Sequence, residues 1–272
     1  MTVWAVVPAK PLDAAKGRLA PLLAPAERRA LAEALLADVL SALVGASVVD
    51  RVLVVSTDPA ALALAECLGA HPVPETTAAH PRGVGPAADG PLNAALGHTA
   101  SIPTSASQRA RTADAEATLN AALNQAAAIA THGGAQALLA LPADLPLITP
   151  GDVAALVAGL PARPFIVLAA TRDGGTSALL RQPPLVLPAA FGPESLRAHL
   201  RAAAAAGVAA RIVWRPNLAL DVDTPADLRR LARRIVWRPN LALDVDTPAD
   251  LRRLARRPPQ TRTGALLARW RL

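Results

Sequence analysis

The sequence is poor in aromatic residues and contains a single cysteine. It has no tyrosine, two phenylalanines and four tryptophans among 272 residues. The lone Cys67 excludes an internal disulfide and is typical of proteins from a reducing compartment. No apolar run is long enough to span a membrane, and the first residues lack the basic and apolar regions of a secretory signal. We therefore expect a soluble, cytoplasmic protein with no membrane partner.

Lysine is also rare, since Lys10 and Lys16 are the only two among 28 basic residues. The other 26 are arginines, in a chain that is rich in alanine, which indicates a compositional bias toward arginine. A lysine that persists against this bias indicates a site that needs a compact ammonium group rather than a planar guanidinium. Chance retention on a surface loop is the alternative.

Positive charge is concentrated near the C-terminus. Residues 1–210 carry 14 basic and 15 acidic side chains, whereas residues 211–272 carry 14 and 6. Part of this excess comes from an exact duplication, because IVWRPNLALDVDTPADLRRLARR occurs at 212–234 and again at 235–257. Only three aromatic side chains in residues 211–272, Trp214, Trp237 and Trp270, could stack on bases. Nucleic-acid binding is therefore the least favoured function, and no nucleic-acid partner is expected.

The chain divides into one main domain at 1–234, the duplicate at 235–257 and a C-terminal tail at 258–272. A stretch at about 76–118, rich in small and polar residues, predicts a flexible insertion. The pentapeptide LNAAL occurs twice around it, so either Asn93 or Asn120 could begin the next helix. We favour Asn120, which is nearer to the following strand.

Predicted strands alternate with predicted helices along the chain. Short apolar runs predict strands at 2–9, 51–57, 70–74, 135–143, 165–171 and 208–214. Apolar spacings of three and four predict helices at 25–43, 58–69, 119–134, 150–160, 193–206 and 224–234. This alternation is typical of an α/β fold with a Rossmann-like, mostly parallel, doubly wound sheet. In such folds ligands bind beyond the carboxyl ends of the strands.

The loop after the first strand contains Lys10, Lys16 and Arg18. Three cations at the carboxyl edge of a parallel sheet could hold a polyphosphate. The loop lacks the GxxxxGK[ST] pattern, so it is not a P-loop. A cluster of solvated surface cations is the alternative interpretation.

Carboxylates follow two other predicted strands. Asp144 stands between Pro142 and Pro146, and Asp221 and Asp223 precede the helix at 224–234. Carboxylate oxygens are ligands that Mg²⁺ prefers, and two strand-end carboxylates could share Mg²⁺ ions facing a nucleotide. Asp144 or Asp223 could instead cap a helix, whereas Asp221 has no such role.

Two further loops combine glycines with hydroxyl side chains, at 173–177 and 191–195. Glycine allows close backbone approach, and free N–H groups near a helix start bind anions. Either loop could be a simple turn. Together they indicate a second anionic ligand at the same edge of the sheet.

Several motifs together resemble one enzyme family. In order they are PAKPLDAAKGRLA, LNAALNQA, LPADLPLIT, DGGTSALL, FGPESLRAHL and LALDVDTPADL, spanning nearly all of residues 3–232. They resemble the guanylyltransferases of coenzyme F-420 biosynthesis, which act on 2-phospho-L-lactate, phosphoenolpyruvate or 3-phospho-D-glycerate. The resemblance implies a GT-A-like nucleotidyltransferase fold, a requirement for GTP and Mg²⁺, and release of pyrophosphate.

The resemblance also implies roles for individual residues, with Lys10, Lys16 and Asp144 as the catalytic set. It implies that the metals are held by Asp144, Asp221 and Asp223, the nucleotide by Lys10, Lys16, Arg18 and Asn120, and the phosphorylated carboxylic acid by Thr176, Gly192 and Ser195. A phosphate oxygen of the acid would attack the α-phosphorus of GTP in line, so positioning and charge neutralisation would supply the catalysis.

Alternatives remain open at this point. The duplicate offers Asp244 and Asp246 as rivals to Asp221 and Asp223. The enzyme could be a cytidylyltransferase or a molybdopterin-type guanylyltransferase, or the duplications could have left an inactive GTP-binding protein. The sequence selects neither the acceptor acid nor the oligomeric state, and an oligomer is possible.

Overall fold

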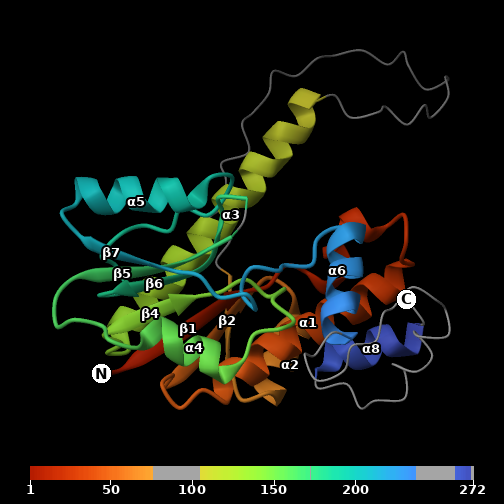
Figure 1. Cartoon of the computed structure of the whole chain (residues 1–272), viewed down its shortest axis with the longest axis horizontal. Helices are drawn as coiled ribbons and strands as arrows, with labels where there is room; N and C mark the ends of the chain where they lie inside the picture. Colours follow the sequence, from red (N-terminus) through yellow and green to blue (C-terminus); the bar gives the residue numbers. More distant parts are fainter. Residues whose placement is uncertain (76–104, 172, 237–260, 271–272) are drawn as a thin grey trace, which may run out of the picture.

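The computed structural model describes residues 1–75, 105–171, 173–236 and 261–270 (Figure 1). The strands of its central sheet are β1 (Val3–Pro8), β2 (Arg51–Ser56), β3 (His71–Pro74), β4 (Ala137–Ala140), β5 (Phe165–Ala170), β6 (Thr176–Gln182) and β7 (Ala209–Val213). Their order across the sheet is β3-β2-β1-β4-β6-β5-β7. Neighbouring strands are parallel except at β6, which is antiparallel to both β4 and β5.

Helices cover both faces of this sheet. They are α1 (Pro25–Val44), α2 (Pro59–Cys67), α3 (Ser105–His132), α4 (Pro150–Val157), α5 (Ser195–Ala205), α6 (Pro225–Val236) and α8 (Arg262–Trp270). In the part of the chain that the structure describes, none of these helices is both long and apolar enough to cross a membrane. The predicted class, a mostly parallel α/β sheet between helices, is confirmed.

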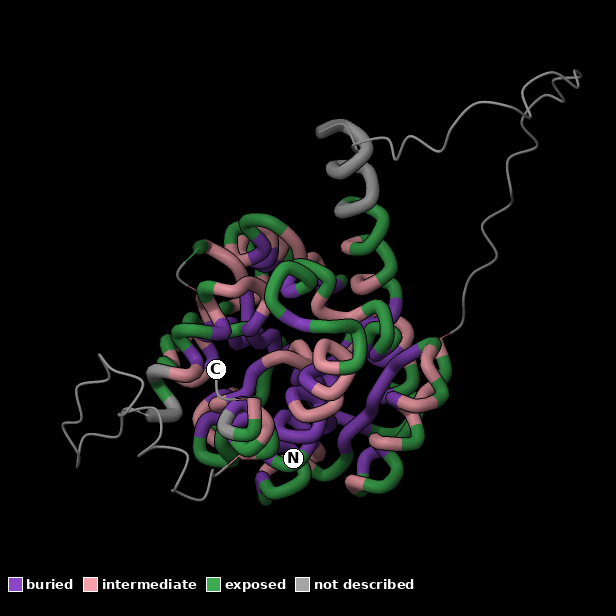
Figure 2. The backbone as a smooth tube through the Cα atoms, turned by 90° about the vertical axis from the view of Figure 1, so that its right-hand side faces the viewer, coloured by how far each residue is buried: buried purple, intermediate pink, exposed green. Residues whose placement is uncertain are grey.

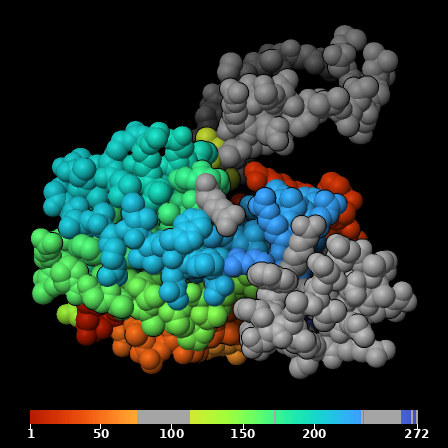
Figure 3. All heavy atoms as spheres, in the orientation of Figure 1, coloured from red at the N-terminus to blue at the C-terminus, as the bar shows by residue number. Residues whose placement is uncertain are grey.

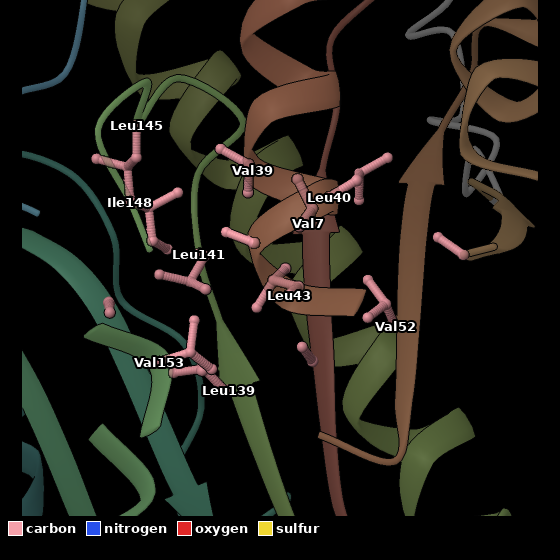
Figure 4. Close-up of a cluster of buried hydrophobic side chains, with 14 of the residues drawn as sticks. Val7, Val39, Leu40, Leu43, Val52, Leu139, Leu141, Leu145, Ile148 and Val153 are labelled. Carbon is pink, nitrogen blue, oxygen red and sulfur yellow. The ribbon is translucent and has the colours of Figure 1, made fainter. Parts of the chain in front are cut away.

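The central strands are buried on both faces, which explains their nearly continuous apolar sequences. Val3, Ala5 and Val7 of β1 pack in one cluster with residues of α1, α2 and α4. Figure 4 shows Val7 beside the side chains of α1 in this cluster. Trp4 and Val6 point to the opposite face, where α3 and α5 pack. Figure 2 shows the buried stretches gathered in the middle of the molecule.

Sequence signals explain where several helices begin. Pro25 occupies the first turn of α1, where a missing N–H costs no hydrogen bond. Asp58 caps α2 through a hydrogen bond from the Ala60 N–H. Thr149 caps α4 by accepting from the Asp152 N–H, and Asp152 accepts in return from the Thr149 N–H. This reciprocal pair is a capping box.

Two elements were not predicted from the sequence. Strand β6 begins at Thr176, within the stretch 173–177 that was predicted to be a loop, and inserts between β4 and β5. Helix α8 lies in the stretch expected to be a tail. Its N-terminal N–H groups, those of Arg262 and Thr263, donate to the two carboxylate oxygens of Asp38 on α1 at 2.7 and 2.9 Å.

Helix α3 begins at Ser105, earlier than the predicted start at 119. Residues 105–118 are therefore helical rather than part of a long loop. Residues 76–104, which hold Asn93, and the duplicate residues 237–257, which hold Asp244 and Asp246, lie outside the described residues.

Candidate active site

Lys16 lies in the loop between β1 and α1, beyond the carboxyl end of a strand in the interior of the sheet. Two short 3-10 turns, Leu12–Ala14 and Gly17–Leu19, shape this loop. Lys16 has left-handed backbone angles, φ 57° and ψ 32°, which cost a non-glycine residue about 1 kcal/mol. Its side chain is 9% exposed. The loop therefore directs one lysine inward at some conformational cost.

The ammonium of Lys16 is shared by two carboxylates. Its Nζ lies 2.7 Å from Oδ2 of Asp144 and 3.0 Å from Oδ1 of Asp223. Asp144 follows β4, the strand next to β1, while Asp223 precedes α6. Burial disfavours the charged lysine, but the two carboxylates outweigh it and raise the pKa of Lys16. Residues from three distant parts of the sequence thus meet at one point.

The remaining residues of the phosphate and metal predictions surround this point. Arg18 is largely exposed, with Nη1 3.9 Å from Oδ2 of Asp223. Lys10 is exposed. Burial would raise the pKa of Asp223, but Lys16, helped by Arg18 and Lys10, lowers it. Reduced hydration, with the carboxylates of Asp144 and Asp223 nearby, raises the pKa of Asp221 to about 6. Positively and negatively charged side chains therefore lie close together at this edge of the sheet.

A buried hydrogen-bond network supports the segment that carries Asp221 and Asp223. Figure 3 shows this segment crossing one face of the molecule between α5 and α6. Asp152 of α4 is 2% exposed, and it accepts hydrogen bonds from Nε of Arg215 and Nδ2 of Asn217, both at 2.9 Å. Sequence reasoning did not select Asp152: its capping box with Thr149 is local, but its contacts with Arg215 and Asn217 are visible only in the tertiary structure.

The residues predicted to bind the acid lie at the same edge of the sheet, where β6 begins antiparallel to β4 and β5, and at the start of α5. Thr176 begins β6 and Ser195 begins α5, and both are buried. Gly192 has φ +146°, in the region that favours glycine, and a Cβ there would lie 2.8 Å from Oε2 of Glu116. The Ser195 N–H donates to the Gly192 carbonyl at 3.1 Å, which closes the loop as a turn.

Asn120 contacts the loop before Gly192. This loop belongs to the acid side of the site, meaning the part around Thr176, Gly192 and Ser195, and not to the charged residues around Lys16. Its Oδ1 accepts from the Phe191 N–H at 2.8 Å, and its Nδ2 donates to the Phe191 carbonyl at 2.9 Å. Both polar atoms of the carboxamide are thus engaged by one backbone residue. The contact favours a structural task in the loop before Gly192 over direct contact with the nucleotide.

Arg181 of β6 was also missed by sequence reasoning. It is fully buried and donates to the Leu187 and Leu123 carbonyls and to Oδ1 of Asn124 at 3.0 to 3.2 Å. Burial lowers its pKa to about 10, so the guanidinium remains charged near neutral pH. It joins β6, α3 and the 183–190 segment beneath the acid side of the site.

The sequence matches the family model described as "Guanylyl transferase CofC like" over residues 3–80 and 101–233. The chain belongs to this family. It is 41% identical over 232 residues to the phosphoenolpyruvate guanylyltransferase of Rubrobacter xylanophilus, which covers 85% of this chain and 94% of that protein. It is 38% identical to the enzyme of the same name from Sphaerobacter thermophilus, over 85% and 93% of the two chains. The prediction of a guanylyltransferase is confirmed.

Solved structures share the fold of this guanylyltransferase. A protein from Desulfovibrio desulfuricans described as a nucleotide-diphospho-sugar transferase aligns over 99% of this chain and 95% of its own, with a TM-score of 0.63 and 14% identity. A nucleotidyl transferase from Methanothermobacter aligns over 86% of this chain and 97% of its own, with a TM-score of 0.51 and 15% identity. The predicted nucleotidyltransferase fold is confirmed.

The bounds of the family match separate the repeated motifs. Asn120, Asp221 and Asp223 lie inside the matched ranges, whereas Asn93 falls in the gap at 81–100. Asp244 and Asp246 follow the end of the match at residue 233. The first copy of LDVDTP and the second copy of LNAAL are thus the ones that correspond to the family.

Proposed function

We propose that this guanylyltransferase transfers GMP from GTP to phosphoenolpyruvate or a closely similar phosphorylated carboxylic acid, as a step of coenzyme F-420 biosynthesis. The observation that carries the proposal is the Lys16 ammonium shared by Asp144 and Asp223 at the edge of the sheet. The names of the similar proteins support phosphoenolpyruvate as the acceptor. Pyrophosphate is the second product.

The carboxylates around Lys16 suit Mg²⁺ bound together with a nucleotide. Among the described residues, no group of three or more His, Cys, Asp and Glu side chains is placed to hold a metal ion unaided. Asp144 and Asp223 nevertheless converge on one cation, which is the Lys16 ammonium. Because Mg²⁺ in nucleotide sites takes one or two carboxylates and completes its shell with phosphates and water, this pair fits it.

Asp144 and Asp223 would therefore hold the metal, with Asp221 beside them. A bound Mg²⁺ would neutralise charge that develops on the phosphates. Lys16 would pair with phosphate oxygens of the nucleotide. The exposed Lys10 and Arg18 would draw in the triphosphate.

The acid side would hold the acceptor for in-line attack. A phosphate dianion is already a nucleophile, so no residue need remove a proton. Thr176 and Ser195 would donate hydrogen bonds to the acid, and the loop at Gly192 would present its backbone to it. Fixing the two anions side by side, with their charges neutralised, would supply most of the rate enhancement.

The experiment measures pyrophosphate release by the full chain with Mg²⁺ and GTP, adding phosphoenolpyruvate, 2-phospho-L-lactate and 3-phospho-D-glycerate in turn. We expect release with phosphoenolpyruvate and none when CTP replaces GTP. Asp144→Ala should abolish release, whereas Asp13→Ala, which removes an exposed acid of the Lys16 loop that pairs with Arg29, should not. GTP binding without release for any acid would overturn the proposal and favour an inactive GTP-binding protein.

A further inference from the structure

Three consecutive backbone N–H groups before Gly192 each donate to a side chain. The N–H groups of Ala189, Ala190 and Phe191 donate to Oδ1 of Asn124, Nε2 of His199 and Oδ1 of Asn120, at 3.0, 3.0 and 2.8 Å. The three acceptors come from α3 and α5, on either side of the loop. A loop fixed at every residue in this way cannot shift without leaving a buried donor unpaired.

His199 holds the central position among these contacts. It is 1% exposed, and its ring meets the Phe191 ring edge to face, with centroids 5.3 Å apart. Nδ1 lies 3.4 Å from Oγ1 of Thr176, and the ring also hydrogen-bonds to the backbone of Ser195. One imidazole therefore contacts Thr176, Ser195 and the loop that leads into Gly192.

The contacts determine which ring nitrogen carries the proton. An imidazole nitrogen that accepts from a backbone N–H has no proton of its own. Since Nε2 accepts from Ala190, the ring hydrogen is on Nδ1, where it faces the Ser195 backbone and Thr176. Burial and the nearby charge of Arg181 lower the pKa of His199 to about 4, in agreement with a neutral ring.

We propose that His199 is a positioning residue for the acceptor, held as the neutral Nδ1–H tautomer that aligns Thr176, Ser195 and the Gly192 loop. The inference rests on the proposed function, because it takes these three residues as the acid-binding set. With the imidazole hydrogen facing Thr176 Oγ1, that oxygen accepts, and its own hydrogen is directed to the acid. Side chains that orient a binding group in this way often change affinity by about tenfold or more.

The first test is the tautomer itself, read from the wild-type protein by nitrogen-15 NMR of histidine side chains at pH 7. We expect the His199 resonances of a protonated Nδ1 and an unprotonated Nε2, assigned by their loss in His199→Gln. A protonated Nε2 would overturn the proposal, as would a doubly protonated ring. This measurement needs no substrate, and the variant serves only to assign the resonances.

The second test separates the KM for the acid from the KM for GTP. His199→Leu, which can neither donate nor accept, should raise the KM for the acid about tenfold and leave that for GTP within twofold. His199→Gln, which retains an acceptor near the Nε2 position, should recover part of this loss. The control His132→Gln removes an exposed ring that bonds only its own helix, and should change neither constant.

Equal increases in both KM values would overturn the proposal, since they would indicate general damage to the fold. A fall in kcat with an unchanged acid KM would also overturn it. If the wild-type chain transfers GMP to none of the three acids, the proposed function fails, whereas the NMR result still decides the arrangement of His199. The two failures are therefore distinguishable.

Discussion

The two sides of the site are built from different kinds of interaction. On the nucleotide side, Lys16, Asp144 and Asp223 are held mainly by one another's charges, and the carboxylates are partly exposed. On the acid side, neutral groups such as Asn120 and the buried His199 hold backbone N–H groups. Charged side chains that pair with one another can pair with phosphates or Mg²⁺ instead. The backbone N–H groups of the loop before Gly192 cannot change hydrogen-bond partners unless the loop moves. The first side is suited to rearrangement and the second to rigid positioning.

The largest effect on kcat should come from removing a carboxylate on the nucleotide side. We expect Asp223→Asn to lower kcat by about a hundredfold to a thousandfold, because the neutral amide holds neither Mg²⁺ nor Lys16 as strongly. The measurement is pyrophosphate release at saturating GTP and acid.

The duplicate supplies a matched control, because Asp246 stands in the same sequence surroundings as Asp223. Asp246→Asn should leave kcat within twofold. The opposite result, with Asp246 essential and Asp223 dispensable, would mean that the second copy carries the site.

The two lysines should differ in how they tolerate arginine. Lys16→Arg should lower kcat about tenfold to a hundredfold, because a planar guanidinium does not fit where a buried ammonium is shared by two carboxylates. Lys10→Arg should stay within threefold, because Lys10 is exposed. Steady-state kinetics with both substrates varied would separate the two variants. Equal tolerance at both positions would contradict a special need for lysine at Lys16.

The sequence predicted the residues of the nucleotide side better than those of the acid side, for a physical reason. Asp144 follows a buried parallel strand, so the edge of the sheet on which it lies could be inferred without knowing its partners. The contact of Asn120 with Phe191 depends instead on how β6 inserts between β4 and β5. β6 was hidden by Gly174 and Gly175, which precede it, and by Arg181, a charged residue that is fully buried.

The same limit applies to the C-terminal helix. Leu267 is buried among residues of α1 and α6, and Asp38 accepts from the first N–H groups of α8. Nothing near residue 262 indicates that distant partner. Local patterns predict the existence of elements, but a buried polar side chain that pairs with a remote backbone group requires the tertiary structure.

A smaller effect on activity is expected from Gly192→Ala on the acid side. The backbone at φ +146° is strained for any residue with a Cβ, at a cost of about 1–3 kcal/mol. The KM for the acid should rise about tenfold while that for GTP is unchanged, as measured by steady-state kinetics.

Two variants isolate the cause of that change. Adding Glu116→Ala to Gly192→Ala removes the nearby carboxylate, and should recover little if backbone strain dominates. Gly207→Ala places a Cβ at another positive φ, +65°, with open space around it, and should leave both KM values unchanged. Full recovery in the double variant would instead indicate a steric conflict with Glu116.

The smallest effect on activity should come from Asp152→Asn, which weakens the hydrogen bonds that hold the segment leading to Asp221 and Asp223 on the nucleotide side. Burial opposes ionisation of Asp152, but hydrogen bonds from Thr149, Asn217 and Arg215 outweigh it and lower its pKa. Losing a hydrogen bond to a buried charged group costs about 1.5–3 kcal/mol, so the free energy of unfolding at pH 7 should fall by about that amount. We expect kcat to stay within threefold.

The pH dependence of this loss has a defined sign. A carboxyl group whose pKa is lower in the folded state stabilises the protein above the ordinary value of about 3.9, and that contribution disappears as pH falls through the folded value. The difference between wild type and Asp152→Asn in urea unfolding should therefore be constant from pH 7 to about 5 and shrink below about 4. Asp13→Asn, which removes an exposed partner of Arg29, should change stability by less than about 1 kcal/mol. If Asp152→Asn instead lowered the free energy of unfolding equally at every pH, the loss would reflect packing rather than the buried charge. The segment that carries Asp221 and Asp223 would then be supported by packing alone.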